Sequence, residues 1–380
     1  MKTMNRSEIT VRRLSNQHIA SHSAARSPAE VLTSLGAMQA QVYHAALWAL
    51  ALRCRDSPTK SDIEEAIAER KISRTWLMRG TLHFASSQDI HWMLRLFAPR
   101  VARFRDRMID TVVSSDSRLG PSEGVVRKAE DLFAKALGGN RQLTRRGMYK
   151  VLERGGIDTS GMLGYHLLYR AAWDGVICFG PHEGKQPTFE LLDERIAGRR
   201  ELSNGRALAE LASRYFTSHG PATIKDYVWW SGLKASDARA GVEGASPRLV
   251  SEEVDGKTYY MAGRAQGPEE EEGDVAVHLL PAFDEYLVGY SDRSAMLGNE
   301  DTQRVLRSGK IQFTNGNGIF LPVIVADGEV VGTWKRRDEK AKVVVTIQPF
   351  MKLDKARIDG IREAAGRYGS FLEKPARVEL

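Results

Sequence analysis

Two glutamines in an apolar setting are the residues of this sequence best suited to chemistry. Gln39 and Gln41 lie two positions apart, between a run that ends at Leu35 and a second run, residues 42–52. A buried primary amide costs free energy unless its donors and its acceptor are all hydrogen-bonded. A neutral amide can hold a water molecule by hydrogen bonds, although it cannot take up a proton near neutral pH. The alternative, typical of most Gln-x-Gln pairs, is one helix-capping glutamine and one solvated glutamine.

The local sequence predicts where this pair lies. Side chains two positions apart point to opposite sides of a helix, but they share one side of an extended segment. Gly36 has a poor helix propensity and weakens the first helix just before the pair. We therefore expect Gln39 and Gln41 at a junction between two helices, with both amides facing one cavity.

Length and composition describe an ordinary globular protein. The 380 residues predict two to four domains, and the contents of 42% hydrophobic and 27% charged residues are typical values. A net charge of +7 favours an anionic partner, although many basic proteins bind nothing acidic. The only cysteines, Cys54 and Cys178, are far apart, so we expect no disulfide framework and no structural zinc site. We also predict no other metal and no cofactor.

The start of the chain indicates its compartment. Residues 1–6 lack the apolar run of a signal peptide, and no uncharged stretch is long enough to span a bilayer. We therefore predict a cytoplasmic protein without a membrane partner.

The first 115 residues have the order of a winged helix. Ser27, Pro28 and Glu30 form a helix-start signal, and helical periods continue to Ile67. A β-rich segment, residues 72–85, follows. Three helices and a two-stranded wing define the winged-helix variant of the helix-turn-helix unit. Residues 1–115 are thus predicted as the first such unit, and they contain the glutamine pair.

The same order recurs twice, in residues 116–198 and 199–266. Thr144 caps a basic helix, and residues 180–187 have the composition of a wing loop. In the third copy, Asp255-Gly256 predicts a hairpin turn.

The remainder, residues 274–380, changes class. Short strands with a hairpin turn at Asp327-Gly328 precede a helix at residues 353–368. This pattern predicts a small β-barrel or sandwich, and an α+β class for the whole chain.

Several motifs together resemble the AlkZ family of winged-helix DNA glycosylases, also called the YcaQ family. The residues that carry the resemblance are Gln39-Ala40-Gln41, residues 78–83, residues 281–284 with Asp292-Arg293, and the run from Asn317-Gly318 to Gly332-Thr333-Trp334. The resemblance covers essentially the whole chain. It implies tandem winged-helix domains in a C-shaped scaffold around duplex DNA, followed by a β-barrel domain. It also implies excision of alkylated purines and, in some members, opening of interstrand crosslinks. The family's catalytic motif is Gln, an apolar residue, then Gln or Asp, and Gln39 and Gln41 match its Gln/Gln form.

The expected function is therefore that of a monofunctional DNA glycosylase, which hydrolyses the N-glycosidic bond of N7- or N3-alkylated purines. The alkylated base is cationic and leaves as a neutral molecule, so the bond is already weak. The transition state is oxocarbenium-like. An amide carbonyl can hold the attacking water and point the negative end of its dipole at the developing positive charge.

Seven side chains are predicted to contact double-stranded DNA: Arg79, His83, Arg100, Arg103, Arg145, Lys185 and Asn317. On a strand, Arg79 and His83 would share a face, where they contact phosphates or support the glutamine site. Their alternative is a surface arginine and a buried histidine. Arg100 and Arg103 share a face of a predicted helix, which is equally compatible with a solvated surface. Asn317 lies at a hairpin tip that can probe a groove or form an ordinary turn.

Two further features have other expected roles. Asp284 is favoured as a capping or turn carboxylate over a catalytic residue, and Trp229-Trp230 is favoured as core over a base-stacking surface. The alternative function is a non-catalytic winged-helix DNA-binding protein, such as a transcriptional regulator. Regulators usually need a dimerisation element to bind paired half-sites. The sequence has no evident one, so we expect a monomeric enzyme.

Overall fold

A computed structural model describes residues 4–20, 27–98, 122–196, 198–263, 276–298, 300–307, 314–315 and 319–380. These residues form two compact units of mixed α/β structure. The first unit combines residues 1–63 with 208–380, and the second comprises residues 64–207. The boundary near residue 63 lies inside the predicted 1–115 domain, so the compact units do not follow the three-repeat division. That division stays a prediction.

The N-terminal part of the first unit is a series of short helices with one extended break. Its elements are α1 (Arg6–Asn16), α2 (Pro28–Leu35), β1 (Met38–Gln39), α3 (Tyr43–Ala51) and the beginning of α4 (Lys60–Ala68). Ser27 and Glu30 form the predicted capping box at the start of α2. At the end of α2, Gly36 has a φ of 84°, a conformation that side chains with a Cβ rarely adopt.

A second helical group in the first unit contains α10 (Asn204–His219), α11 (Ile224–Ser231) and α12 (Ala235–Ala245). It is followed by the antiparallel hairpin of β7 (Leu249–Val254) and β8 (Lys257–Ala262). The predicted turn is confirmed, because Asp255 and Gly256 both have the positive φ angles of a type I′ turn.

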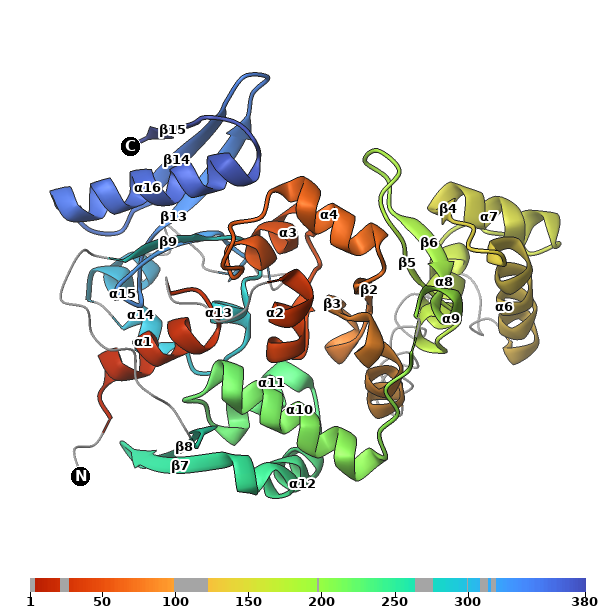
Figure 1. The fold of residues 1–380 in the computed structure, drawn as a ribbon, viewed down its shortest axis with the longest axis horizontal. Coiled ribbons are helices and arrows are strands. Elements are labelled where there is room, and N and C mark those ends of the chain that lie inside the picture. The colour runs from red at the N-terminus through yellow and green to blue at the C-terminus, as the bar shows by residue number, and fades with distance from the viewer. Residues whose placement is uncertain are drawn as a thin grey trace. The chain divides into compact units, whose positions relative to one another are not determined.

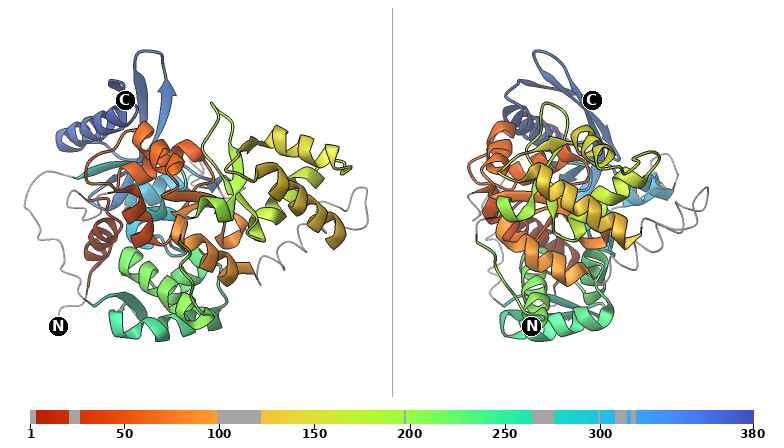
Figure 2. Two further views of the ribbon diagram at one scale, coloured as in Figure 1. Left: turned by 45° about the vertical axis from the view of Figure 1, so that its right-hand side comes forward. Right: turned by 90° about the vertical axis from the view of Figure 1, so that its right-hand side faces the viewer.

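The C-terminal part of the first unit is one five-stranded sheet with a long helix against it, α16 (Lys355–Phe371) (Figures 1 and 2). The strand order is β15 (Ala376–Glu379), β14 (Val343–Pro349), β13 (Glu329–Asp338), β12 (Val323–Ala326) and β9 (Val277–Leu280). Only the β14–β15 pair is parallel. Within the described residues this sheet is open, with β9 and β15 at its edges, so the predicted small β-barrel or sandwich is represented by one open sheet with the predicted helix against it. Trp48 of α3 joins the helices to the sheet, since its Nε1–H donates to the Leu279 carbonyl at 2.8 Å.

Short elements connect the two groups and the sheet. They are α13 (Glu285–Val288), α14 (Ser294–Leu297), α15 (Glu300–Arg307) and the paired strands β10 (Thr314–Asn315) and β11 (Ile319–Phe320).

In the second unit, the strands of the first two predicted wings share one sheet. The order is β3 (Leu82–Ser86), β2 (Ile72–Trp76), β5 (Ile177–Phe179), β6 (Thr188–Leu191) and β4 (Leu143–Thr144). Arg74 pairs with Phe179 where the two hairpins meet. Helices α6 (Glu123–Leu137), α7 (Arg145–Arg154) and α8 (Leu163–Trp173) lie to one side of the β5–β6 hairpin (Figures 1 and 2). Short helix α9 (Leu192–Arg195) follows β6.

Candidate active site

The glutamine pair lies where the sequence predicts it, in the extended break between α2 and α3. Gln39 is the second residue of β1, and Gln41 precedes the start of α3 at Tyr43 by two residues. The two side chains differ in exposure: Gln39 is 8% exposed, whereas Gln41 is exposed. Gln39 is thus enclosed by protein and Gln41 is open to solvent, so the expectation that both amides face one cavity stays a prediction.

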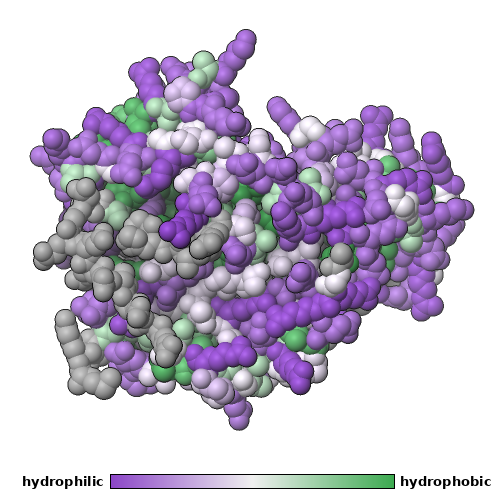
Figure 3. Space-filling view, in the orientation of Figure 1, coloured by the Kyte–Doolittle hydropathy of each residue, from purple (hydrophilic) through white to green (hydrophobic). Residues whose placement is uncertain are grey.

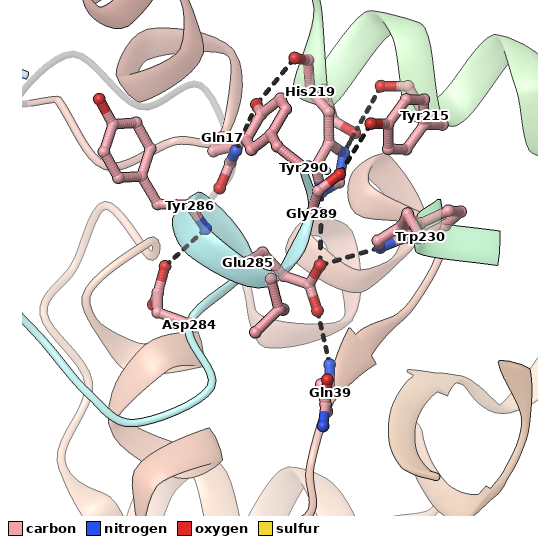
Figure 4. Close-up of polar contacts among 12 residues, drawn as sticks. Gln17, Gln39, Tyr215, His219, Trp230, Asp284, Glu285, Tyr286, Gly289 and Tyr290 are labelled. Carbon is pink, nitrogen blue, oxygen red and sulfur yellow. Dashed lines mark hydrogen bonds and ion pairs between the residues drawn. The ribbon is translucent and has the colours of Figure 1, made fainter. Parts of the chain in front are cut away.

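A buried carboxylate from a distant part of the sequence holds the backbone of Gln39. The backbone N–H of Gln39 donates to Glu285 Oε1 at 2.6 Å, and Trp230 Nε1–H donates to Glu285 Oε2 at 2.9 Å (Figure 4). Glu285 has no exposed surface. Two N–H donors, one on each oxygen, therefore hold the Glu285 side chain and the β1 backbone together.

His219 completes the surroundings of this carboxylate. Its Nε2 lies 3.5 Å from Glu285 Oε2, its Nδ1 lies 2.8 Å from Ser218 Oγ, and its ring stacks on Tyr215 at 4.7 Å. Burial is the largest influence on the pKa of His219 and lowers it, while Glu285 acts in the opposite direction. A neutral imidazole therefore lies beside Glu285.

Asp284 has a structural role at this site. Its two oxygens accept from Arg53 Nη2 at 2.7 Å and Nη1 at 2.8 Å, and Oδ1 also accepts the Tyr286 N–H at 2.9 Å. Both side chains of the ion pair are completely buried. Asp284 is the N-cap of α13, which agrees with the capping carboxylate favoured from the sequence.

A chain of hydrogen bonds runs from this ion pair to the backbone of His219. Arg53 Nη2 also donates to Gln17 Oε1 at 3.2 Å, and Gln17 Nε2 donates to the Tyr290 hydroxyl at 2.9 Å. That hydroxyl donates to the His219 carbonyl at 2.8 Å (Figure 4). The 284–290 segment is therefore held at Asp284 and at Tyr290, and its Glu285 bonds the backbone of β1.

The lowered pKa of His219 predicts how stability depends on pH. The unfolded imidazole, with a pKa near 6.5, binds protons over a range in which the folded one does not. The contribution of His219 to the free energy of unfolding is therefore fully present above about pH 6.5. It is lost as the pH falls toward the lower pKa of the folded protein. We expect urea unfolding of the wild type to lose up to about 1.4 kcal/mol per pH unit more than His219→Phe in this range. Equal pH slopes for the two proteins would contradict the assignment.

The predicted pair Arg79 and His83 is not on one strand. Arg79 lies in a 3-10 turn at Met78–Gly80 with a φ of 57°, because the β2–β3 connection needs a left-handed residue there. His83 does lie on β3, but it has no exposed surface, and its Nδ1 is 2.9 Å from the Thr81 carbonyl. The alternative of a buried histidine describes His83, and a buried side chain cannot touch a phosphate.

The other predicted DNA contacts divide into described and undescribed residues. Arg145 is the exposed first residue of α7, where the Thr144 hydroxyl caps the Gly147 N–H at 3.3 Å. Lys185 is exposed in the β5–β6 loop, which is closed by two backbone hydrogen bonds between Glu183 and Gln186. The helices of the second unit present a mostly hydrophilic surface (Figure 3). Arg100, Arg103 and Asn317 lie outside the described residues.

Sequence reasoning missed several residues behind the glutamines. Glu285 directly follows the Pro281–Asp284 motif, so the neighbouring motif could have indicated it as a site residue. Arg53, Gln17 and His219 carried no signal, since they reach the site only through tertiary contacts. The predicted core role of Trp229-Trp230 is half right: Trp230 is fully buried, whereas Trp229 is 47% exposed.

The described residues offer neither a metal site nor a membrane-spanning helix. No group of three or more His, Cys, Asp or Glu side chains among them is arranged as a metal site. Their helices also include none with the length and apolar character needed to cross a membrane.

Comparison with known proteins identifies the class. A family model described as DNA glycosylase AlkZ-like matches residues 32–371. A curated relative, the interstrand DNA cross-link repair glycosylase of Streptomyces sahachiroi, is 26% identical over 356 residues, which is 89% of each chain. The solved structure of Streptomyces sahachiroi DNA glycosylase AlkZ has a similar fold, with a TM-score of 0.75 at 23% identity over the whole of both chains.

Because the family model covers most of the sequence, this chain belongs to the AlkZ-like DNA glycosylase family. It is a DNA glycosylase, a hydrolase of N-glycosyl bonds. The predicted family is confirmed, and the alternative of a non-catalytic regulator is set aside.

Proposed function

We propose that this enzyme excises N7- and N3-alkylated purines from double-stranded DNA as a monofunctional glycosylase, including purines joined in interstrand crosslinks. The observation that carries the proposal is the Gln39–Gln41 pair in one extended segment, with its backbone tied to buried Glu285. The name of the Streptomyces relative supports the crosslinked substrate.

Neutral amides suit this substrate class. An alkylated purine leaves as a neutral base without prior protonation, so the enzyme needs no strong acid. The remaining task is to hold a water against the sugar and to stabilise an oxocarbenium-like transition state. In this proposal the amide carbonyls of Gln39 and Gln41 accept hydrogen bonds from that water and direct their dipoles at the positive charge.

The DNA is bound, in this proposal, by a monomeric C-shaped scaffold of tandem winged-helix units, residues 1–115, 116–198 and 199–266. Phosphate contacts come from Arg79, Arg100, Arg103, Arg145 and Lys185, and Asn317 probes a groove. His83 makes no contact with DNA in this proposal, because its side chain is buried. A cytoplasmic location stays a prediction from the sequence.

Charge reversal at the two exposed, described cations tests the DNA contacts. Arg145→Glu and Lys185→Glu should each weaken binding to undamaged and damaged duplex equally. Each should also reduce the slope of log K against log salt by about 1, because one counterion-releasing contact is lost. Fluorescence anisotropy over a salt series measures both effects. Lys352→Glu, the same charge change at an exposed residue before α16, serves as the control. An unchanged slope in Arg145→Glu and Lys185→Glu would remove these residues from the interface.

A crosslinked duplex tests the substrate class. The two purines of an N7–N7 interstrand crosslink in a labelled oligonucleotide keep the strands together on a denaturing gel. Hydrolysis of one glycosidic bond separates them and leaves an alkali-labile abasic site. Strand separation without an abasic site, or neither product from crosslinked and monoalkylated duplexes alike, would refute the proposal.

A further inference from the structure

We propose that Glu285 is a positioning residue for the reaction, which sets the orientation of the Gln39–Gln41 segment through its hydrogen bond to the Gln39 backbone. The inference rests on the proposed function, because it assumes that these two glutamines hold the attacking water.

The segment that carries the glutamines has little regular structure of its own. Strand β1 has only two residues, and Gly36 ends the preceding helix with a positive φ. The 2.6 Å bond from the Gln39 N–H to Glu285 Oε1 joins this segment to residues 246 positions away. A small shift of a backbone at this point would move both amides, and displacements of about 1 Å can reduce enzymatic rates by about 100-fold.

The Glu285 carboxylate is itself held in place. Trp230 donates to Oε2, and α13 is fixed by the Arg53–Asp284 ion pair next to it. Immediately before this pair, Phe283 has a φ of 61°, which an aromatic residue adopts only where the surroundings enforce it. The carboxylate that bonds the Gln39 backbone is thus fixed by its own neighbours.

The chemistry of these partners explains why a carboxylate stands here. Gln39 N–H and Trp230 Nε1–H are both donors, on different oxygens. A carboxylate accepts on both oxygens, whereas an amide presents one acceptor and one NH₂ group, so Glu285→Gln can keep the Gln39 bond by turning its NH₂ group toward Trp230. Glu285→Leu keeps about the volume of the side chain but offers no acceptor, so the Gln39 and Trp230 N–H groups both lose their bond.

The experiment compares Glu285→Leu with a matched control. Glu190→Leu makes the same change at a buried carboxylate of the second unit, which is bonded to Arg195 at 2.5 Å. Single-turnover excision from a duplex with one N7-methylguanine, DNA affinity and thermal unfolding are measured for each protein, at a temperature where all are folded.

We expect Glu285→Leu to lower the single-turnover rate constant by about 10- to 100-fold, with the Kd for DNA changed less than about 3-fold. Glu190→Leu should lose thermal stability but keep a rate constant within about 3-fold of the wild type. A wild-type rate constant for Glu285→Leu, or an equal loss in Glu190→Leu, would overturn the proposal.

Hydrogen exchange provides a readout that does not depend on activity. The backbone N–H of Gln39, in a peptide covering residues 36–42, should exchange at least 10-fold faster in Glu285→Leu, while peptides from α16 stay unchanged. Unchanged exchange would overturn the positioning claim. Faster exchange in an enzyme without excision activity would refute the proposed function and leave Glu285 as the support of this segment.

Discussion

Replacement of Gln39 or Gln41 by alanine is expected to lower the excision rate constant by about 100- to 1,000-fold, the usual effect of removing one group that stabilises transition-state charge. DNA affinity should be retained, because neither amide supplies a positive charge. The Gln39→Ala variant keeps its hydrogen bond to Glu285, since that bond uses the backbone N–H. The loss therefore reports on the amide and not on the position of the segment.

The measurement is single-turnover formation of abasic sites, with anisotropy for binding. Gln348→Ala, at an exposed position of β14, is the matched control and should react like the wild type. Rate constants within a few-fold of the wild type for both active-site variants would exclude the pair from catalysis.

The largest expected effect on stability concerns the Arg53–Asp284 ion pair. Arg53→Met should lower the free energy of unfolding by about 3–5 kcal/mol, because it leaves Asp284 charged and buried without its cation. Urea unfolding measures the change. Both side chains have no exposed surface, so solvent cannot replace the lost partner.

An exposed pair provides the comparison. Arg362 and Asp359 on α16 are 3.0 Å apart, with side chains 62% and 50% exposed. Arg362→Met should change the free energy of unfolding by less than about 1 kcal/mol. If Arg53→Met were equally mild, the buried pair would not be the support of the 284–290 segment that we describe.

Local signals in the sequence predicted local structure well. The Ser27–Glu30 capping box and the turns at Asp255-Gly256 and Asp327-Gly328 are all present, because each depends on residues within a few positions. The junction that places Gln39 and Gln41 between two helices is confirmed for the same reason.

Long-range arrangement was beyond such signals. The pairing of β2 with β5 joins two predicted wings in one sheet, and the parallel strand β15 was missed because its partner β14 lies beyond a whole helix. The β-forming neighbours of Arg79 predict a strand at this position. In the structure Arg79 instead lies in the turn between β2 and β3, which needs a positive φ there. The bond between Gln39 and Glu285 depends on the folded first unit, so no pattern near residue 39 could predict it.

The most direct test of the central claim is incubation of the wild-type enzyme with a duplex that carries a single N7-methylguanine. Mass spectrometry of the small-molecule fraction and mild alkaline treatment of the DNA follow. We predict release of free N7-methylguanine in equal amount to alkali-labile abasic sites, with no strand break before the alkali and no release from undamaged guanine. Tight binding of the same duplex without release of the base would contradict excision of simple alkylated purines by this enzyme.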